Sequence, residues 1–197
     1  MYPVSPIFIY LLVGIVHHIV IFRAADARFD GINHYFRTMK RRILFVCLGN
    51  ICRSPAAEGV LRDMALRSGM EERVEIDSAG TYSGHAGQLP DTRMRAVALA
   101  RGYVLTHHAR PVRESDFFDF DIIIAMDDNN YHNLFRLAPT IESREKIFRM
   151  SEFFTRHKEW THVPDPYYEG HEGFELVLDM LEDGCAEILR RAAKGTL

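Results

Sequence analysis

The sequence predicts one folded α/β domain, in which helices cover a parallel sheet, over the part of the chain that follows residue 38. From residue 42 onward, short apolar runs rich in branched side chains alternate with segments of helical periodicity, a pattern typical of β-α-β units. Residues 122–125 form a continuous apolar run, as expected of a strand buried on both faces of a sheet. The 197 residues, 47% of them hydrophobic and 26% charged, are enough to build one substantial core.

The first predicted strand spans residues 43–46 and leads, through a loop at residues 47–53, into a helix. Ser54 can cap this helix, and Pro55 suits its first position. Gly69 can end it. The apolar face of the helix is predicted to consist of Ala57, Val60, Leu61, Met64 and Ala65.

A second strand is predicted at residues 74–76, because a short apolar alternation precedes a polar and glycine-containing stretch. Residues 81–90 contain two glycines and end in a proline, which indicates a loop. A helix over residues 91–101 follows, and Gly102 stops it.

The third strand is the run at residues 122–125, and a short helix around residues 134–138 is ended by Pro139. Residues 147–150 form a weaker strand candidate, and residues 160–173 form a loop marked by proline and glycine. The final helix is predicted to bury one side, formed by Phe174, Leu178, Leu181, Cys185 and Ile188.

Charge and cysteine content exclude some classes of function. The formal net charge is -3, from 24 basic and 27 acidic residues, so bulk electrostatics gives no reason to expect a nucleic-acid partner. Three cysteines, Cys47, Cys52 and Cys185, do not make a disulfide framework. Their number and spacing favour a reducing compartment, and hence the cytoplasm.

Residues 1–38 differ in composition from the predicted domain at residues 39–197. Residues 7–22 are apolar apart from one glycine and two histidines, slightly short of the roughly 20 residues that span a bilayer. Basic residues follow this segment, so a membrane anchor would leave the downstream domain in the cytoplasm. A cleaved signal is a second interpretation, weakened by the lack of Lys or Arg before the apolar run. A non-native extension is the third, with Met39 as the natural start.

The loop at residues 47–53 has the features of an anion-binding cradle. Successive backbone N–H groups in such a loop can point inward, and the positive end of the following helix adds its partial charge. Gly49 permits backbone conformations that other residues avoid. The same field stabilises a thiolate at Cys47, and the planar guanidinium of Arg53 can hold two phosphate oxygens at once. A lone cysteine at a strand end is more often a core residue, but Gly49 and Arg53 favour a nucleophile.

The string Cys-Leu-Gly-Asn-Ile-Cys-Arg-Ser-Pro at residues 47–55 resembles the signature of the low-molecular-weight protein-tyrosine phosphatases. Asp-Ser-Ala-Gly-Thr at 77–81, His-x-Ala-Arg at 107–110, a Met-Asp pair at 126–127 and Asp-Pro-Tyr-Tyr at 165–168 follow in that family's order. The resemblance covers residues 39–197. It implies a three-layer, flavodoxin-like α/β fold with a four-stranded parallel sheet flanked by helices, and neither metal nor cofactor.

The resemblance also implies the reaction, which is hydrolysis of phosphotyrosine in proteins through a phosphocysteine intermediate. Cys47 would be the nucleophile, Arg53 the phosphate clamp and Asp165 the general acid and base. Substrate proteins carrying phosphotyrosine, with a tyrosine kinase as one candidate, are the implied partners. Phosphate and substrate would be bound by Leu48, Gly49, Asn50, Ile51, Cys52, Ser54, Tyr167 and Tyr168, with Ser78 and His107 in support.

Several further residues match family positions with less direct roles. Ser54 could donate a hydrogen bond to the sulfur of Cys47. Asp127 and Arg110 match positions beneath the site, where a structural role is expected. Cys52 would form a reversible disulfide with Cys47 under oxidation, whereas Cys185 is expected in the core.

One departure from the family pattern leaves substrate preference open. Family members often carry a large aromatic residue where this chain has Gly84, with Tyr82 and His85 nearby. Ile51 resembles the tyrosine-directed branch of the family rather than the branch that acts on phosphoarginine.

Two other functions compete with the phosphatase. A thioredoxin-coupled arsenate reductase uses a similar loop but needs a further pair of cysteines, and apart from the loop cysteines this chain has only Cys185. A non-catalytic module that binds phosphate or senses oxidants would need neither a nucleophile nor an acid, so the joint presence of Cys47, Arg53 and Asp165 argues against it.

Overall fold

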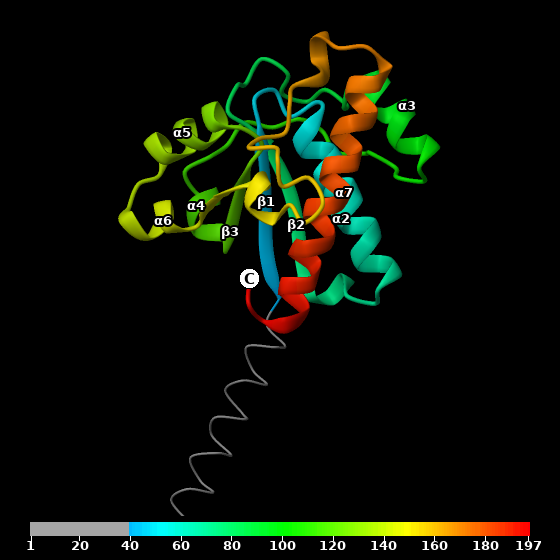
Figure 1. The fold of residues 1–197 in the computed structure, drawn as a ribbon. Helices are drawn as coiled ribbons and strands as arrows, with labels where there is room; N and C mark the ends of the chain where they lie inside the picture. The colour runs from blue at the N-terminus through cyan, green and yellow to red at the C-terminus, as the bar shows by residue number, and fades with distance from the viewer. Residues whose placement is uncertain (1–39) are drawn as a thin grey trace, which may run out of the picture. The chain divides into compact units, whose positions relative to one another are not determined.

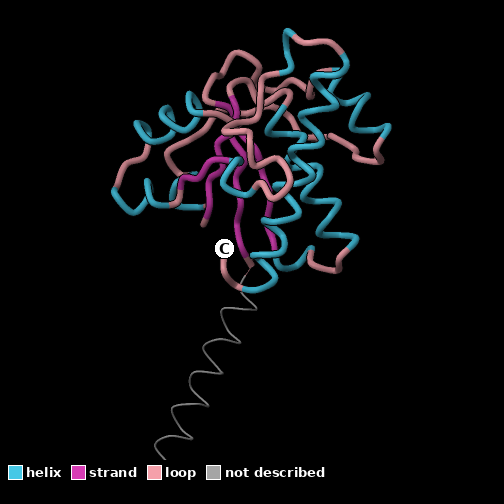
Figure 2. Tube along the Cα trace, viewed as in Figure 1, coloured by secondary structure: helices cyan, strands magenta, loops and turns pink. Residues whose placement is uncertain are grey.

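The structure is a computed structural model that describes residues 40–197. Within that range four strands form one parallel sheet in the order β2-β1-β3-β4 (Figures 1 and 2). The predicted α/β class, its three layers and its four parallel strands are therefore confirmed. The strands are β1 (Arg41–Cys47), β2 (Val74–Gly80), β3 (Ile122–Ala125) and β4 (Ile147–Arg149).

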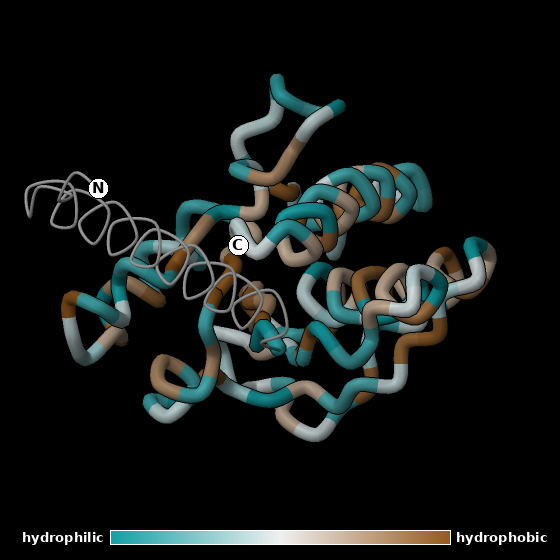
Figure 3. Tube along the Cα trace, turned by 90° about the horizontal axis from the view of Figure 1, so that it is seen from below, coloured by the Kyte–Doolittle hydropathy of each residue, from teal (hydrophilic) through white to brown (hydrophobic). Residues whose placement is uncertain are grey.

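Helices cover both faces of this sheet (Figure 1). Alternate residues of β1 serve the two faces: Ile43 and Phe45 join one buried cluster with α2 and α7, while Leu44 and Val46 join another with Phe117. In Figure 3 hydrophobic and hydrophilic residues are interspersed along the helical segments, as a one-sided burial requires. The helices are α2 (Arg53–Arg67), α3 (Thr92–Ala100), α4 (Asp116–Asp119), α5 (Asp128–Leu137), α6 (Ile141–Glu145) and α7 (His171–Lys194).

Most of the predicted elements are present at or near their expected positions. Gly69 and Gly102 both adopt positive φ directly after the helices that they were expected to end. The five residues expected on the buried side of the last helix are all buried. Helices α4 and α6 and three short 3-10 segments were not predicted; these segments are η1 (Glu71–Arg73), η2 (Met150–Phe153) and η3 (Pro166–Tyr168).

The predicted capping role of Ser54 is wrong. Helix α2 begins at Arg53, two residues before the predicted first position at Pro55, and its N-cap is Cys52, which makes no side-chain capping bond. Ser54 thus lies inside the first turn. Its hydroxyl oxygen lies 3.1 Å from the sulfur of Cys47 and 3.2 Å from the carbonyl oxygen of Ala79, because the preceding loop turns the side chain toward the end of β1.

The parallel register gathers the carboxyl ends of the strands at one edge of the sheet. Cys47 pairs with Gly80, and Val46 pairs with Ala125. The loops that leave β1, β2 and β3 therefore start side by side (Figure 1). Binding sites in parallel α/β proteins lie at this edge.

Asp183 on α7 fixes the segment after η2. Its buried carboxylate accepts hydrogen bonds from the backbone N–H groups of Thr155, Arg156 and His157, at 2.9–3.1 Å, and from the Thr155 hydroxyl at 2.6 Å. Burial alone would raise the pKa of Asp183, but these hydrogen bonds outweigh it and hold the pKa well below its usual value.

The proposed extension at residues 1–38, with its apolar segment at 7–22, lies outside the described residues. Over residues 40–197, no helix has both the length and the apolar character needed to cross a bilayer.

Candidate active site

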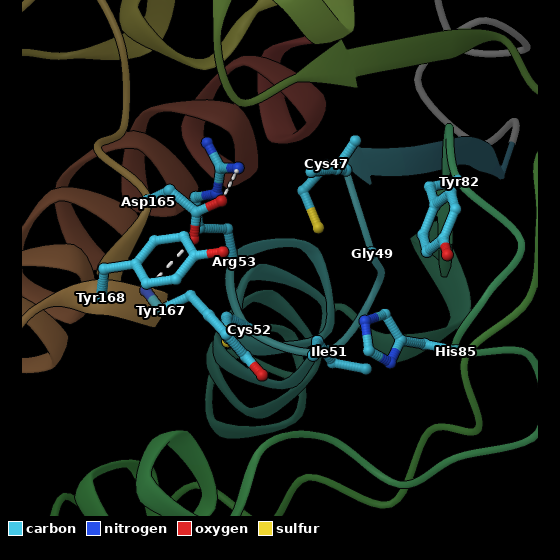
Figure 4. A pocket seen from close by; sticks show the side chains of 11 residues that line it. Cys47, Gly49, Ile51, Cys52, Arg53, Tyr82, His85, Asp165, Tyr167 and Tyr168 are labelled. Atoms are coloured by element: carbon cyan, nitrogen blue, oxygen red, sulfur yellow. Dashed lines mark hydrogen bonds and ion pairs between the residues drawn. The ribbon is translucent and has the colours of Figure 1, made fainter.

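The loop between β1 and α2 brings the sulfur of Cys47 to the N-terminal end of a 15-residue helix. The backbone N–H of Asn50 donates to this sulfur at 3.2 Å, and the Ser54 hydroxyl oxygen lies 3.1 Å from it. Cys47 is only 2% exposed, yet it lines a pocket (Figure 4). The loop thus directs a backbone N–H, a hydroxyl group and the positive end of a helix toward one sulfur atom.

Asn50 holds the loop in shape. Its φ is 54°, a left-handed conformation that few residues other than glycine adopt. Its buried side-chain amide group donates to the hydroxyls of Ser54 and Ser78, both at 2.9 Å. Its amide oxygen lies 2.9 Å from Nε2 of His107 and accepts a hydrogen bond from the backbone N–H of Arg110 at 2.9 Å.

A buried carboxylate completes this network behind the loop. The Ser78 hydroxyl donates to Oε2 of Glu58 at 2.7 Å, and Nδ1 of His107 lies 3.1 Å from the same oxygen. Glu58 is 7% exposed, which is unusual for an ionisable side chain. Asn50 bridges this network to the loop, so Ser78 and His107 contact the loop from behind through the Asn50 side chain, whereas the sequence did not indicate Glu58.

The guanidinium of Arg53 is held in place by two carboxylates and a backbone carbonyl group. Its Nη1 donates to Asp127 at 2.6 Å and to the Val163 carbonyl oxygen at 3.1 Å. Its Nη2 donates to Asp165 at 2.8 Å (Figure 4). Burial would lower the pKa of Arg53, but the negative charges of Cys47, Asp165 and Asp127 raise it. A guanidinium held in this way is oriented before an anion arrives, so less entropy is lost on binding.

Asp165 sits at the start of the 3-10 segment η3, between Pro164 and Pro166. One carboxylate oxygen accepts from the backbone N–H of Tyr167 at 3.3 Å and the other pairs with Arg53. The side chain is 40% exposed. The carboxyl group is thus near the clamp and open to solvent, as a proton donor to a substrate must be.

The pocket has a volume of about 240 Å³ and two side walls above the loop. Asp165, Tyr167 and Tyr168 stand on one side of Cys47, and Tyr82 and His85 stand on the other (Figure 4). The loop itself contributes Leu48, Gly49, Ile51, Cys52 and Arg53 to the lining.

The structure therefore brings nine of the predicted site residues to one pocket and places the others just behind it. Asn50, Ser54, Ser78 and His107 do not line the pocket; they form the network that shapes the loop. Tyr82 and His85 were noted in the sequence, but their place on the wall was not predicted.

The other two cysteines differ from Cys47. Both are free thiols, and burial raises the pKa of each. At Cys52, which lines the pocket, the negative charge of Asp91 raises the pKa further. Cys185 is fully buried on α7, where its thiol donates to the carbonyl oxygen of Ala57 at 3.6 Å. It does not line the pocket, so the described geometry offers no cysteine relay of the kind an arsenate reductase needs.

Among residues 40–197, Glu58, Asp77 and His107 form a group whose ligand atoms lie within 4.8 Å of one another. These atoms already have partners within the protein. Arg110 donates to Oδ2 of Asp77 at 2.7 Å and 3.0 Å, and Glu58 and His107 belong to the loop network. These three side chains are thus already engaged in the hydrogen-bonding network behind the loop.

Comparison with known proteins shows which protein family this chain is similar to. Residues 42–196 match the family model described as low molecular weight phosphotyrosine protein phosphatase. A relative from Schizosaccharomyces pombe with that same name is 44% identical over 157 residues, covering 79% of this chain and 99% of the relative. A low molecular weight protein-tyrosine-phosphatase from Streptomyces coelicolor is 41% identical over 152 residues, covering 77% and 93%.

The fold is also similar to solved structures. A crystal structure of a protein tyrosine phosphatase from Entamoeba histolytica has a TM-score of 0.77 and 47% sequence identity, covering 80% of this chain and all of that one. The chain thus spans nearly the full length of the proteins that it matches.

Proposed function

Because the chain belongs to the low molecular weight phosphotyrosine protein phosphatase family, which hydrolyses phosphotyrosine through a cysteine nucleophile, we propose that Cys47, Arg53 and Asp165 carry that reaction. The observation that supports these roles best is their convergence on one pocket. The sulfur of Cys47, the buried guanidinium of Arg53 and the accessible carboxyl group of Asp165 all line it.

In the first step the thiolate of Cys47 attacks phosphorus, so that a sulfur–phosphorus bond forms and the bond from phosphorus to the tyrosine oxygen breaks. Asp165, in its protonated form, transfers its proton to that departing oxygen. Arg53 and the backbone N–H groups of the loop stabilise the negative charge on the non-bridging oxygens.

In the second step a water molecule attacks the phosphocysteine. The carboxylate of Asp165 takes the proton of the water, the sulfur–phosphorus bond breaks, and inorganic phosphate leaves. Ser54 can donate a hydrogen bond to the released thiolate, since its hydroxyl oxygen lies 3.1 Å from the sulfur. Asp165 is thereby protonated again and ready for the next substrate.

The substrates are phosphoproteins. We further propose that a tyrosine kinase is one of the substrates, that the protein is located in the cytoplasm and that it has no nucleic-acid partner. Support for the cytoplasm comes from the three free thiols among the described residues. We also propose that residues 7–22 contact a membrane, with the domain on the cytoplasmic side. Fractionation of cells that express the full chain tests this contact, and recovery wholly in the soluble fraction would reject it.

The residue roles are tested by hydrolysis of a phosphotyrosine peptide at mildly acidic pH in the presence of a chelator. The parent should be active, Cys47→Ser inactive, and Asp165→Ala slowed by roughly 100- to 10,000-fold in kcat. Phe118→Ala, an exposed aromatic on α4 outside the pocket, is the control and should match the parent. A parent that binds phosphate without hydrolysing the peptide would instead support the binding or sensing interpretation.

A further inference from the structure

The wall formed by Tyr82 and His85 is built by residues that no step of the mechanism uses. Tyr82 is 55% exposed, and it faces the pocket across Cys47 from Tyr167 (Figure 4). The Tyr82 and His85 rings meet edge to face, with centroids 6.0 Å apart and an interplanar angle of 75°. Such aromatic pairs are favourable beyond their burial.

Gly84 provides the space that the Tyr82 ring occupies. A Cβ atom added at Gly84 would lie 2.3 Å from three atoms of that side chain, including its hydroxyl oxygen. Gly84 is not among the glycines with positive φ, so its backbone does not itself require glycine. The missing side chain at position 84 therefore matters because it lets the ring of Tyr82 fold over this position.

Gly49 does the same for His85. A Cβ atom at Gly49 would lie 2.9 Å from Cδ2 of His85, so the imidazole packs directly against the phosphate-binding loop. Nδ1 of His85 lies 3.0 Å from the side-chain oxygen of Gln88, which fixes the ring. Two glycines thus make room for two rings on one wall.

The wall is tied to the loop that it faces. The backbone N–H of Tyr82 donates to the carbonyl oxygen of Leu48 at 2.9 Å. At the far end, Gly87 N–H donates to the Ala109 carbonyl oxygen at 2.7 Å, and Ala109 N–H donates to that of Gln88 at 2.8 Å. A segment held at both ends keeps its rings at a fixed distance from the reaction centre, and such preorganisation reduces the entropy lost on binding.

We propose that Tyr82, seated over Gly84 and braced by His85, forms an aryl-binding wall opposite Tyr167 and determines the specificity of the site for aryl over alkyl phosphate esters. This inference rests on the proposed function of the same pocket. A planar ring attached to the phosphate would lie between the two walls, whereas the shorter side chain of phosphoserine would reach neither.

The first test compares Tyr82→Ala with the parent on two peptides that differ only in phosphotyrosine against phosphoserine. The loss of one aromatic contact should lower kcat/KM for the phosphotyrosine peptide by about three- to tenfold, mainly through KM. The selectivity ratio between the peptides should fall by the same factor. Inhibition by inorganic phosphate, which has no aryl group, should change by less than about twofold.

The second test is a double-mutant cycle with Gly84→Ala. In the parent background this substitution displaces the Tyr82 ring, so it should cost about as much as Tyr82→Ala. In the Tyr82→Ala background it should cost nothing further, because no ring remains to be displaced. An equal cost of Gly84→Ala in both backgrounds would show that glycine serves the backbone, and would overturn the inference.

The remaining outcomes separate this inference from the proposed function. If the parent fails to hydrolyse the phosphotyrosine peptide, the proposed function fails. If the parent is active and Tyr82→Ala keeps its kcat/KM and selectivity, the inference alone is overturned. A loss of phosphate inhibition equal to the loss in kcat/KM would also overturn it, since Tyr82 would then act by supporting the loop. Phe118→Ala, also 55% exposed, is the matched aromatic control.

Discussion

Asn50→Ala should destabilise the protein strongly, because one side chain joins the phosphate-binding loop to the network behind it. The substitution removes four hydrogen bonds. Ser54 and Ser78 keep other partners, in Cys47 and Glu58. The larger cost falls on the two groups that bond to the Asn50 amide oxygen.

Those two groups are Nε2 of His107 and the backbone N–H of Arg110. Each partly buried group left unpaired costs about 1–3 kcal/mol, and alanine at a left-handed φ costs about 1–2 kcal/mol more. Because His107 and Arg110 are only partly buried, water can replace part of each lost hydrogen bond, and we expect a total in the lower half of the range that these costs add up to. The free energy of unfolding should therefore fall by about 3–5 kcal/mol. Asn50→Gly removes the same bonds without the backbone strain and should be about 1 kcal/mol more stable than Asn50→Ala.

Urea unfolding followed by the fluorescence of Trp160, the one tryptophan in the chain, measures these differences. Asn129→Ala, an exposed asparagine on α5, is the control and should lie within about 0.5 kcal/mol of the parent. A loss below about 1 kcal/mol for Asn50→Ala would refute the assigned role of the network. Equal stability of the alanine and glycine variants would show that the left-handed φ at position 50 does not destabilise alanine there.

Three further predictions concern single side chains. Asp165→Asn should lower kcat roughly 100- to 10,000-fold yet strengthen inhibition by inorganic phosphate, because Nη2 of Arg53 loses its carboxylate partner; unchanged inhibition would contradict the pairing. Asp183→Asn should lower the free energy of unfolding at pH 7 by about 1–3 kcal/mol. Because the pKa of Asp183 is lowered in the folded protein, the stabilisation from its carboxylate is complete above the unfolded-state pKa of about 3.9 and is lost as pH falls toward the folded-state pKa. Urea titrations should therefore show the deficit of Asp183→Asn shrinking below about pH 4. A deficit independent of pH would contradict the assignment. After peroxide treatment, a thiol reductant should restore activity to the parent but not to Cys52→Ser, and equal recovery would argue against a disulfide between Cys47 and Cys52.

The phosphate-binding loop could be predicted because its signal is local. A strand, a glycine-containing turn and a helix start lie within a few residues of one another at Cys47–Arg53, and the chemistry of anion binding requires these parts in this order. Asp165 carries no such local signal, since an aspartate between prolines also suits an ordinary turn. Its position beside Arg53 depends on chain segments 112 residues apart.

Most of the features that could not be predicted from the sequence are fixed by contacts between residues that are far apart in the chain. Glu58 occupies the middle of α2, where a charged residue suggests a solvated face; its burial is set by Ser78 and His107, which are remote in sequence. Tyr82 was placed in a flexible-looking glycine-rich loop, and its contact with Gly84 is visible only in three dimensions. Helices α4 and α6 have four and five residues, too few to show a helical period.

The central claim, that Cys47 becomes covalently phosphorylated during turnover, is tested most directly by rapid quenching of Asp165→Asn with a phosphotyrosine peptide followed by mass spectrometry. The peptide that contains Cys47 should carry one added phosphoryl group, and the corresponding peptide of Cys47→Ser should carry none. Hydrolysis that persists in Cys47→Ser, or a phosphoryl group attached to another residue, would contradict it.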